Sequence, residues 1–228
     1  MLHDVTLPRR VGAEVLGTAL LVIAVVGSGI AAERLSPNDV GVQLLENAAA
    51  TGLVLAVIIL VLGPVSGAHL NPVVTLLVRA DGGTTNRDAL AYVGGQFAGA
   101  VIGTFVAHAM FDVPVLQAST HTRSAGHLWL AEILATAGLV LVVFGLGRGG
   151  NVAAIPFAVG GYIAAAYFFT SSTSFANPAV TVARAFTDTF SGIRPSSVPA
   201  FVIAQCAGGA VGYGAVRFFF PAREHVDA

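Results

Sequence analysis

Residues 66–75 read SGAHLNPVVT and residues 172–181 read STSFANPAVT. The two stretches are identical at five of ten positions, and the shared residues include the pair Asn-Pro. Asn at an N-cap with Pro at the first helical position is a helix-start pattern. The apolar segments that contain them, 63–79 and 171–187, are too short to span a bilayer, which takes about 20 residues. Each is predicted to be a re-entrant half-helix, which membranes tolerate only where it is buried or lines a water-filled cavity.

The rest of the chain is apolar on the scale of a membrane protein. Of its 228 residues 55% are hydrophobic and only 10% are charged, and the mean hydropathy is +0.81. Soluble domains carry about 25% charged residues, and disordered chains are polar, so both classes are excluded. The predicted fold is an all-α polytopic membrane protein with six transmembrane helices and two half-helices. The expected spans are 11–32, 41–62, 89–111, 127–147, 152–170 and 198–220.

The two halves of the chain repeat each other. Residues 13–22 (AEVLGTALLV) and 131–140 (AEILATAGLV) are identical at seven of ten positions. Each half holds three spans, an odd number, so the second half is expected to insert upside down, and inverted repeats place functional sites near the midplane. We expect a single transmembrane domain over 1–228, with repeat one at about 9–111, an outer connecting loop at 112–126 and repeat two at about 127–220.

The charged residues indicate orientation and exclude several partners. The 11 basic residues are all Arg, and there are 12 acidic residues. The chain therefore has no excess of positive charge with which to bind the phosphates of a nucleic acid. Seven Arg fall on the side of the termini and four on the other, which favours cytoplasmic termini in the inner (plasma) membrane. The lone Cys206 excludes a Cys-based metal cage. Since the His residues show no metal-ligand spacing and no Ser-His pair appears, we expect neither cofactor, metal nor enzyme.

These motifs resemble the aquaporin and aquaglyceroporin family, the major intrinsic proteins. SGAHLNPVVT, SFANPAVT and the AE-x-L-x-T opening of both halves carry the resemblance, which covers about residues 9–220. It implies that the half-helices meet at their N-termini in the centre of a pore, where their positive dipole ends oppose cations and protons. The implied central motif is Asn71, Pro72, Val73, Asn177, Pro178 and Ala179. Val73 stands where the family usually has Ala, and we expect its methyl groups to reshape the centre slightly.

The resemblance also implies a lining of the pore and a constriction outside the centre. Backbone carbonyls are expected to face the lumen along Gly67, Ala68, His69, Leu70, Thr173, Phe175 and Ala176, with loop packing favoured over gating or metal binding for His69. Spacing from the two Asn residues carries the four constriction positions of the family to Thr51, Ala165, Ser174 and Val180. Most members have an Arg at the place of Val180. Its replacement by Val predicts a wide, weakly selective filter.

Three further side chains allow alternative interpretations. Arg184 falls one turn outside Val180 on the same helix face, so it is a candidate for the outer vestibule. The alternative is a snorkelling Arg or one paired with Glu46 or Asp188. Glu14 and Glu132 lie inside spans, where a carboxylate is costly unless it is hydrogen-bonded. The resemblance implies that each braces a half-helix loop; the rival reading is a proton-coupling carboxylate.

The resulting functional prediction is a passive channel for small uncharged solutes and water in a lipid bilayer, assembled by resemblance as a homotetramer. The motif SFANPAVTVARAF with Thr51 and Val180 resembles a bacterial branch often associated with arsenic resistance genes. That implies metalloid hydroxides and arsenicals as solutes, together with glycerol and water. The alternatives are an ordinary glycerol or water facilitator and a proton-coupled secondary transporter.

Overall fold

The computed structural model describes residues 5–221, and the secondary structure within that range is entirely helical. Six helices are long and apolar enough to cross a membrane, as predicted, and their bounds differ from the expected spans by a few residues. They are α1 (Leu7–Leu35), α2 (Val40–Ser66), α4 (Asn86–Met110), α5 (Gly126–Arg148), α6 (Ile155–Phe169), which the 3₁₀ turn η2 (Val152–Ala154) precedes, and α8 (Val198–Phe219), which the 3₁₀ turn η4 (Pro195–Ser197) precedes.

The two Asn-Pro motifs begin short helices, as their sequence pattern predicts. Asn71 caps α3 (Pro72–Ala80), where its Oδ1 accepts the amide of Val73 at 2.9 Å. Asn177 caps α7 (Pro178–Ala183) in the same way, through the amides of Ala179 at 3.0 Å and Val180 at 3.3 Å. Pro at the first helical position fixes φ and has no N–H to leave unpaired. The 3₁₀ turn η3 (Arg184–Phe186) extends α7.

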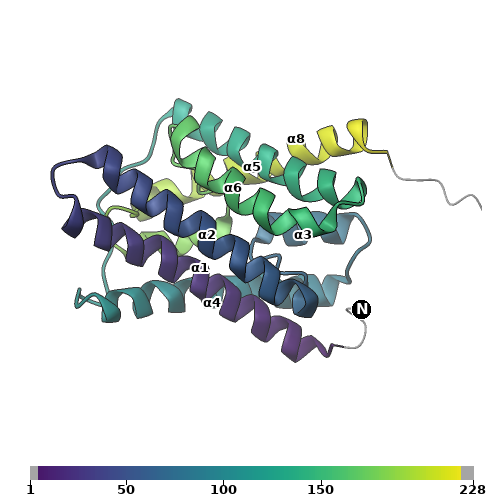
Figure 1. Ribbon diagram of the computed structural model, residues 1–228, viewed down its shortest axis with the longest axis horizontal. Helices are drawn as coiled ribbons and strands as arrows, with labels where there is room; N and C mark the ends of the chain where they lie inside the picture. The colour runs from purple at the N-terminus through teal and green to yellow at the C-terminus, as the bar shows by residue number, and fades with distance from the viewer. Residues whose placement is uncertain (1–4, 222–228) are drawn as a thin grey trace, which may run out of the picture.

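The long helices pair within each repeat. α1 packs on α4 and α5 packs on α8, and Figure 1 shows the six long helices running roughly along one direction. Small residues allow these close contacts. A Cβ on Gly99 would strike the carbonyl of Val15 in α1, and a Cβ on Gly208 would strike the carbonyl of Ile133 in α5. In Figure 1 the start of α1 and the end of α8 lie at the same end of the molecule, as an even number of spans requires.

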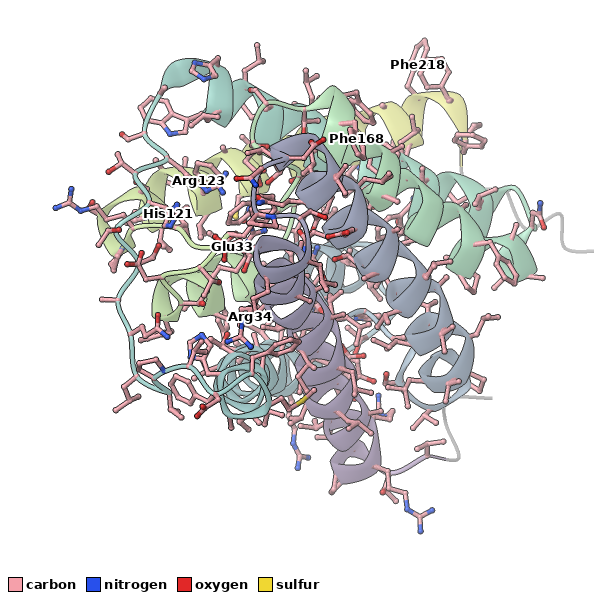
Figure 2. The ribbon with its side chains drawn as sticks, turned by 60° about the vertical axis from the view of Figure 1, so that its left-hand side comes forward. Glu33, Arg34, His121, Arg123, Phe168 and Phe218 are labelled. Carbon is pink, nitrogen blue, oxygen red and sulfur yellow. The ribbon has the colours of Figure 1, made fainter. Side chains whose placement is uncertain are left out.

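The outer surface of the helices is apolar. Phe168 on α6 is 54% exposed and Phe218 on α8 is 80% exposed, and Figure 2 shows Phe218 pointing away from the helices. Contiguous exposure of this kind over six apolar helices suits contact with lipid rather than with water. The protein is therefore a multi-pass membrane protein.

Candidate functional site

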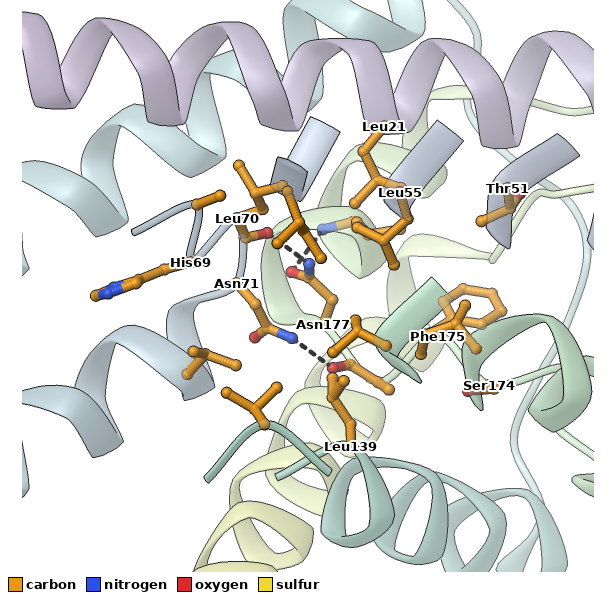
Figure 3. Close-up of a pocket in the computed structure, with 18 of the residues that line it drawn as sticks. Leu21, Thr51, Leu55, His69, Leu70, Asn71, Leu139, Ser174, Phe175 and Asn177 are labelled. Carbon is orange, nitrogen blue, oxygen red and sulfur yellow. Dashed lines mark hydrogen bonds between the residues drawn. The ribbon is translucent and has the colours of Figure 1, made fainter. Parts of the chain in front are cut away.

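The two half-helices meet at their N-termini in the middle of the molecule and are bonded across the repeat. Asn71 Nδ2 donates to the carbonyl of Ala176, and Asn177 Nδ2 donates to the carbonyl of Leu70, both at 2.7 Å (Figure 3). Each amide nitrogen carries two hydrogens, so one of them remains for the lumen. The carbonyls of Leu70 and Ala176, which were expected to face the lumen, each use part of their accepting capacity for these bonds.

The loops before the half-helices have a strained backbone that repeats across the two halves. Ala68 and Leu70 have φ of 46° and 51°, and Ser174 and Ala176 have φ of 49° and 48°. Residues other than glycine rarely adopt this left-handed backbone conformation, and they keep it only where the surrounding structure holds them. Both loops therefore need strong anchors.

Two buried carboxylates supply those anchors. Glu14 on α1 accepts the amide of His69 at 3.0 Å and that of Leu70 at 2.7 Å. Glu132 on α5 accepts the amides of Phe175 and Ala176, both at 2.9 Å. Neither Glu is among the residues that line the central cavity. Hydrogen bonds from several N–H groups offset the cost of burying a carboxylate.

A glutamine completes each anchor. Gln96 Nε2 donates to Glu14 at 2.8 Å and to Thr75 at 2.9 Å. In the second repeat, Gln205 Nε2 donates to Glu132 at 2.6 Å and to Thr181 at 2.8 Å. Each Gln thus ties a carboxylate to the half-helix that it supports. This explains why Glu, Gln and Asn recur in register in the two halves of the sequence.

A cavity of about 220 Å³ passes along the Asn pair. In Figure 3, Thr51, Ser174 and Phe175 lie on one side of Asn71 and Asn177, and His69 lies on the other. Of the residues predicted for the pore, those that line this cavity are Gly67, Ala68, His69, Leu70, Asn71, Ser174, Phe175, Ala176, Asn177, Thr51, Val180 and Arg184. Those that do not are Pro72, Val73, Thr173, Pro178, Ala179 and Ala165.

The structure does not bring Ala165 to the filter. Ala165 is exposed on α6, whereas Ile155, Val159, Ile163 and Tyr167 line the cavity at intervals of four residues. Ala165 lies two positions from the last two of these, which is about half a turn around a helix. Tyr167 takes the place by the filter that was expected for Ala165, and its hydroxyl donates to Thr51 Oγ1 at 3.3 Å. The four-residue apolar stripe was the signal that could have found it.

Val73 also points away from the pore, contrary to the expectation that it reshapes the centre. Its side chain joins a cluster with Val140, Phe144 and Val216 behind the half-helix. A Cβ on Gly209 of α8 would lie only 2.5 Å from Val73 Cγ1. The larger residue of the first motif is therefore accommodated by the absence of a side chain on α8.

This pairing predicts a rescue. Gly209→Ala should lower the free energy of unfolding of the detergent-solubilised protein by about 1–3 kcal/mol, because overpacking forces Val73 and α8 apart. Val73→Ala in the same chain should restore most of that loss, since it removes the clashing methyl groups. Gly214→Ala is the control, because nothing lies within 4 Å of a Cβ there. Equal losses for Gly209→Ala with and without Val73→Ala would contradict the pairing.

Arg184 lies at the cavity and has neither of the carboxylate partners considered above. It is 2% exposed, its Nε donates to the carbonyl of Ser191, and its guanidinium carbon lies 3.3 Å from the centroid of the Phe175 ring. Asp188 instead accepts the amide and hydroxyl of Thr120 at 2.7 and 2.9 Å, and these bonds lower the pKa of Asp188. Glu46 accepts the hydroxyl of Ser36 at 2.9 Å.

A helical membrane protein in which two half-helices from an inverted repeat meet beside a lined cavity is a channel of the aquaporin type. The chain belongs to the major intrinsic protein family, whose model matches residues 1–150 and 146–228. It is a passive channel for water and small solutes, and this family contains no enzymes.

Relatives support the same assignment. The chain is 49% identical to "Aquaglyceroporin AqpS" of Rhizobium meliloti (strain 1021), over 97% of this chain and 95% of that protein. It is 30% identical to "Aquaporin-2" of Rattus norvegicus, over 81% of this chain and 70% of that protein. The X-ray structure of the aquaglyceroporin from Plasmodium falciparum shares the fold, with a TM-score of 0.70, 20% identity, and coverage of 92% and 96% of the two chains.

Proposed function

We propose that the channel passes oxygen-rich neutral solutes of glycerol size and larger, including metalloid hydroxides such as arsenite and methylated arsenicals, along with glycerol and water. The observation that carries this proposal is Val180, an aliphatic residue that lines the cavity at the position where most family members have an Arg. A Val there leaves more room and takes hydrogen-bond donors away from the narrow part of the pore. Thr51 and Ser174 beside it are also small, whereas the fourth position is taken by the larger Tyr167, so the proposal of extra room rests on Val180.

The lining suits such solutes chemically. One wall is apolar, with Leu21, Leu55 and Val159, and the Asn pair offers N–H donors opposite. A polyol or a metalloid hydroxide presents several hydroxyl oxygens to such donors and a compact body to the apolar wall. The printed name of the relative from Rhizobium meliloti, an aquaglyceroporin, agrees with a solute channel rather than a channel for water alone.

The decisive experiment is stopped-flow light scattering on proteoliposomes exposed in parallel to water, glycerol and arsenite gradients. We expect flux above that of protein-free liposomes for all three solutes. Permeability to water alone would contradict the proposal and leave an ordinary water facilitator. Flux that depends on a proton gradient would instead support a coupled transporter, although Glu14 and Glu132 are both engaged in hydrogen bonds away from the cavity.

We also infer cytoplasmic termini and a tetrameric assembly. The excess of Arg on the side of the termini supports cytoplasmic termini in the inner (plasma) membrane. The family resemblance supports a homotetramer with one pore in each subunit.

A further inference from the structure

The outer part of the cavity contains a positive charge that the Val180 substitution alone would not suggest. Arg184 follows Val180 by one helical turn and lines the same cavity. A buried guanidinium is costly unless its charge is met by a partner. Within residues 5–221 no carboxylate lines this cavity and no salt bridge reaches Arg184. Glu132, which accepts the amide of Phe175, attracts this charge without contacting it, so no carboxylate of the described residues is bonded to the guanidinium of Arg184 at the cavity.

The geometry fixes the guanidinium without using all of its donors. Nε bonds to the carbonyl of Ser191, and the plane of the group lies on the ring of Phe175. The structure gives neither Nη atom a protein acceptor among the described residues. Cation–π contact and one backbone bond hold an Arg in place, yet the outer edge of its fork remains free to bind two oxygens.

A second, independent feature lies beside it. Ser174 lines the cavity, and its hydroxyl is buried and has no hydrogen-bond partner in the described part of the chain. Buried polar groups in folded proteins are normally paired, so an unpaired one at a cavity points to a bound molecule. Thr51 Oγ1 accepts from Tyr167 at the same end of the cavity, and its own hydrogen is available to donate.

Arg123 adds to the positive potential. It comes from the connecting segment, and Figure 2 shows it lying between that segment and the helices. Its guanidinium carbon is 5.1 Å from the centroid of Phe175, and it donates to the carbonyls of Gly192 at 3.0 Å and Ser172 at 3.4 Å. Two guanidinium groups thus contact one aromatic ring, and both are held by carbonyls rather than by carboxylates.

We propose that Arg184 and Ser174 form an oxyanion site in the outer cavity, through which the channel also takes up small oxyacids as singly charged anions. Arg184 would contact two oxygens of the solute through its Nη atoms, and Ser174 would donate to a third. The positive N-termini of α3 and α7 lie further along the path and favour an anion as they oppose a cation. This inference rests on the proposed solute channel, because it assigns a further solute class to the same pore.

The test uses methylphosphonate, an oxyacid that carries one negative charge at mildly acidic pH, with glycerol as the neutral reference. Swelling of proteoliposomes is measured in each solute at one pH. In Arg184→Gln the ratio of methylphosphonate flux to glycerol flux should fall about tenfold. The reason is that the variant loses two charge-assisted hydrogen bonds from the guanidinium to oxygens of the anion. Ser174→Ala should lower the ratio less. Arg194→Gln is the matched control, because Arg194 is an exposed Arg that does not line the cavity, and its ratio should equal that of the wild type.

A second measurement needs no variant. In wild-type proteoliposomes, an inside-positive membrane potential set with potassium and valinomycin should accelerate methylphosphonate uptake and leave glycerol uptake unchanged. A rate of methylphosphonate uptake that does not change with the membrane potential, or an unchanged flux ratio in Arg184→Gln, would overturn the proposal of an oxyanion site. If glycerol still passes in that case, the proposed solute channel stands without it. If neither solute passes, the proposed function itself fails. If Arg184→Gln does not fold, the measurement of potential in the wild type decides.

Discussion

Replacing Val180 with Arg lowers the flux of glycerol and of larger solutes by about tenfold, equivalent to a barrier of about 1.4 kcal/mol, and lowers water flux less. The reason is steric and electrostatic together. Val180 and Arg184 line the same cavity one turn apart, so the substitution places a second guanidinium beside the first. Two like charges at that distance repel each other, so the two side chains extend into the lumen. Stopped-flow flux of water, glycerol and arsenite measures the effect.

Val180→Leu separates size from charge, because it adds volume without a cation. We expect it to reduce flux only modestly. Combining Val180→Arg with Arg184→Gln keeps one positive charge and moves it inward, and this variant should recover part of the flux lost in Val180→Arg. An equal reduction of water and large-solute flux in Val180→Arg would argue against a wide filter.

Glu132→Ala destabilises the protein by about 3 kcal/mol or more and abolishes solute flux, since buried groups left without a hydrogen-bond partner cost about 1–3 kcal/mol each. The carboxylate accepts the amides of Phe175 and Ala176 and the side chain of Gln205. Its removal leaves these three donors without the acceptor that Glu132 provides. It also releases the left-handed backbone at Ser174 and Ala176, whose conformation those bonds maintain. Thermal unfolding in detergent and flux in proteoliposomes measure the two effects.

Glu33→Ala is the matched control for Glu132→Ala. Glu33 is exposed and accepts one amide, that of Phe190 at 3.1 Å. Its removal should change stability little, because water replaces the lost partner. Glu14→Ala should resemble Glu132→Ala, since Glu14 holds the opposite loop with the same kinds of bonds. A stable Glu132→Ala variant with normal flux would mean that the loop needs no such anchor.

The course of the chain could be predicted from the sequence because it depends on local patterns. Apolar runs of spanning length predict the six long helices, and they appear within a few residues of their expected bounds. Asn-Pro predicts the starts of α3 and α7, which begin at Pro72 and Pro178. The inverted repeat requires a shared centre, where the two Asn residues lie.

The direction in which individual side chains point could not be predicted in the same way. Counting back from Asn177 to Ala165 crosses a loop of irregular backbone, so the rotation of α6 is lost along the way. Contact with α2 sets that rotation: a Cβ on Gly52 would lie 2.6 Å from the carbonyl of Gly160. This close approach turns Tyr167 toward the cavity and leaves Ala165 outside. Val73 turned away from the pore for a similar reason, since Gly209 leaves room behind it.

The sequence by itself determined that this is a membrane protein of six spans with two half-helices, because composition and short-range patterns suffice for that conclusion. That it is a channel followed from the resemblance of its two Asn-Pro motifs to those of the major intrinsic proteins. The sequence also identified Val180 as the departure from the usual filter. Only the tertiary structure decided that Arg184 faces the cavity with its charge unpaired by any carboxylate of the described chain. That outcome depends on Phe175 and Ser191, which fold back against Arg184 from either side of it in the sequence, and no local pattern encodes such a contact.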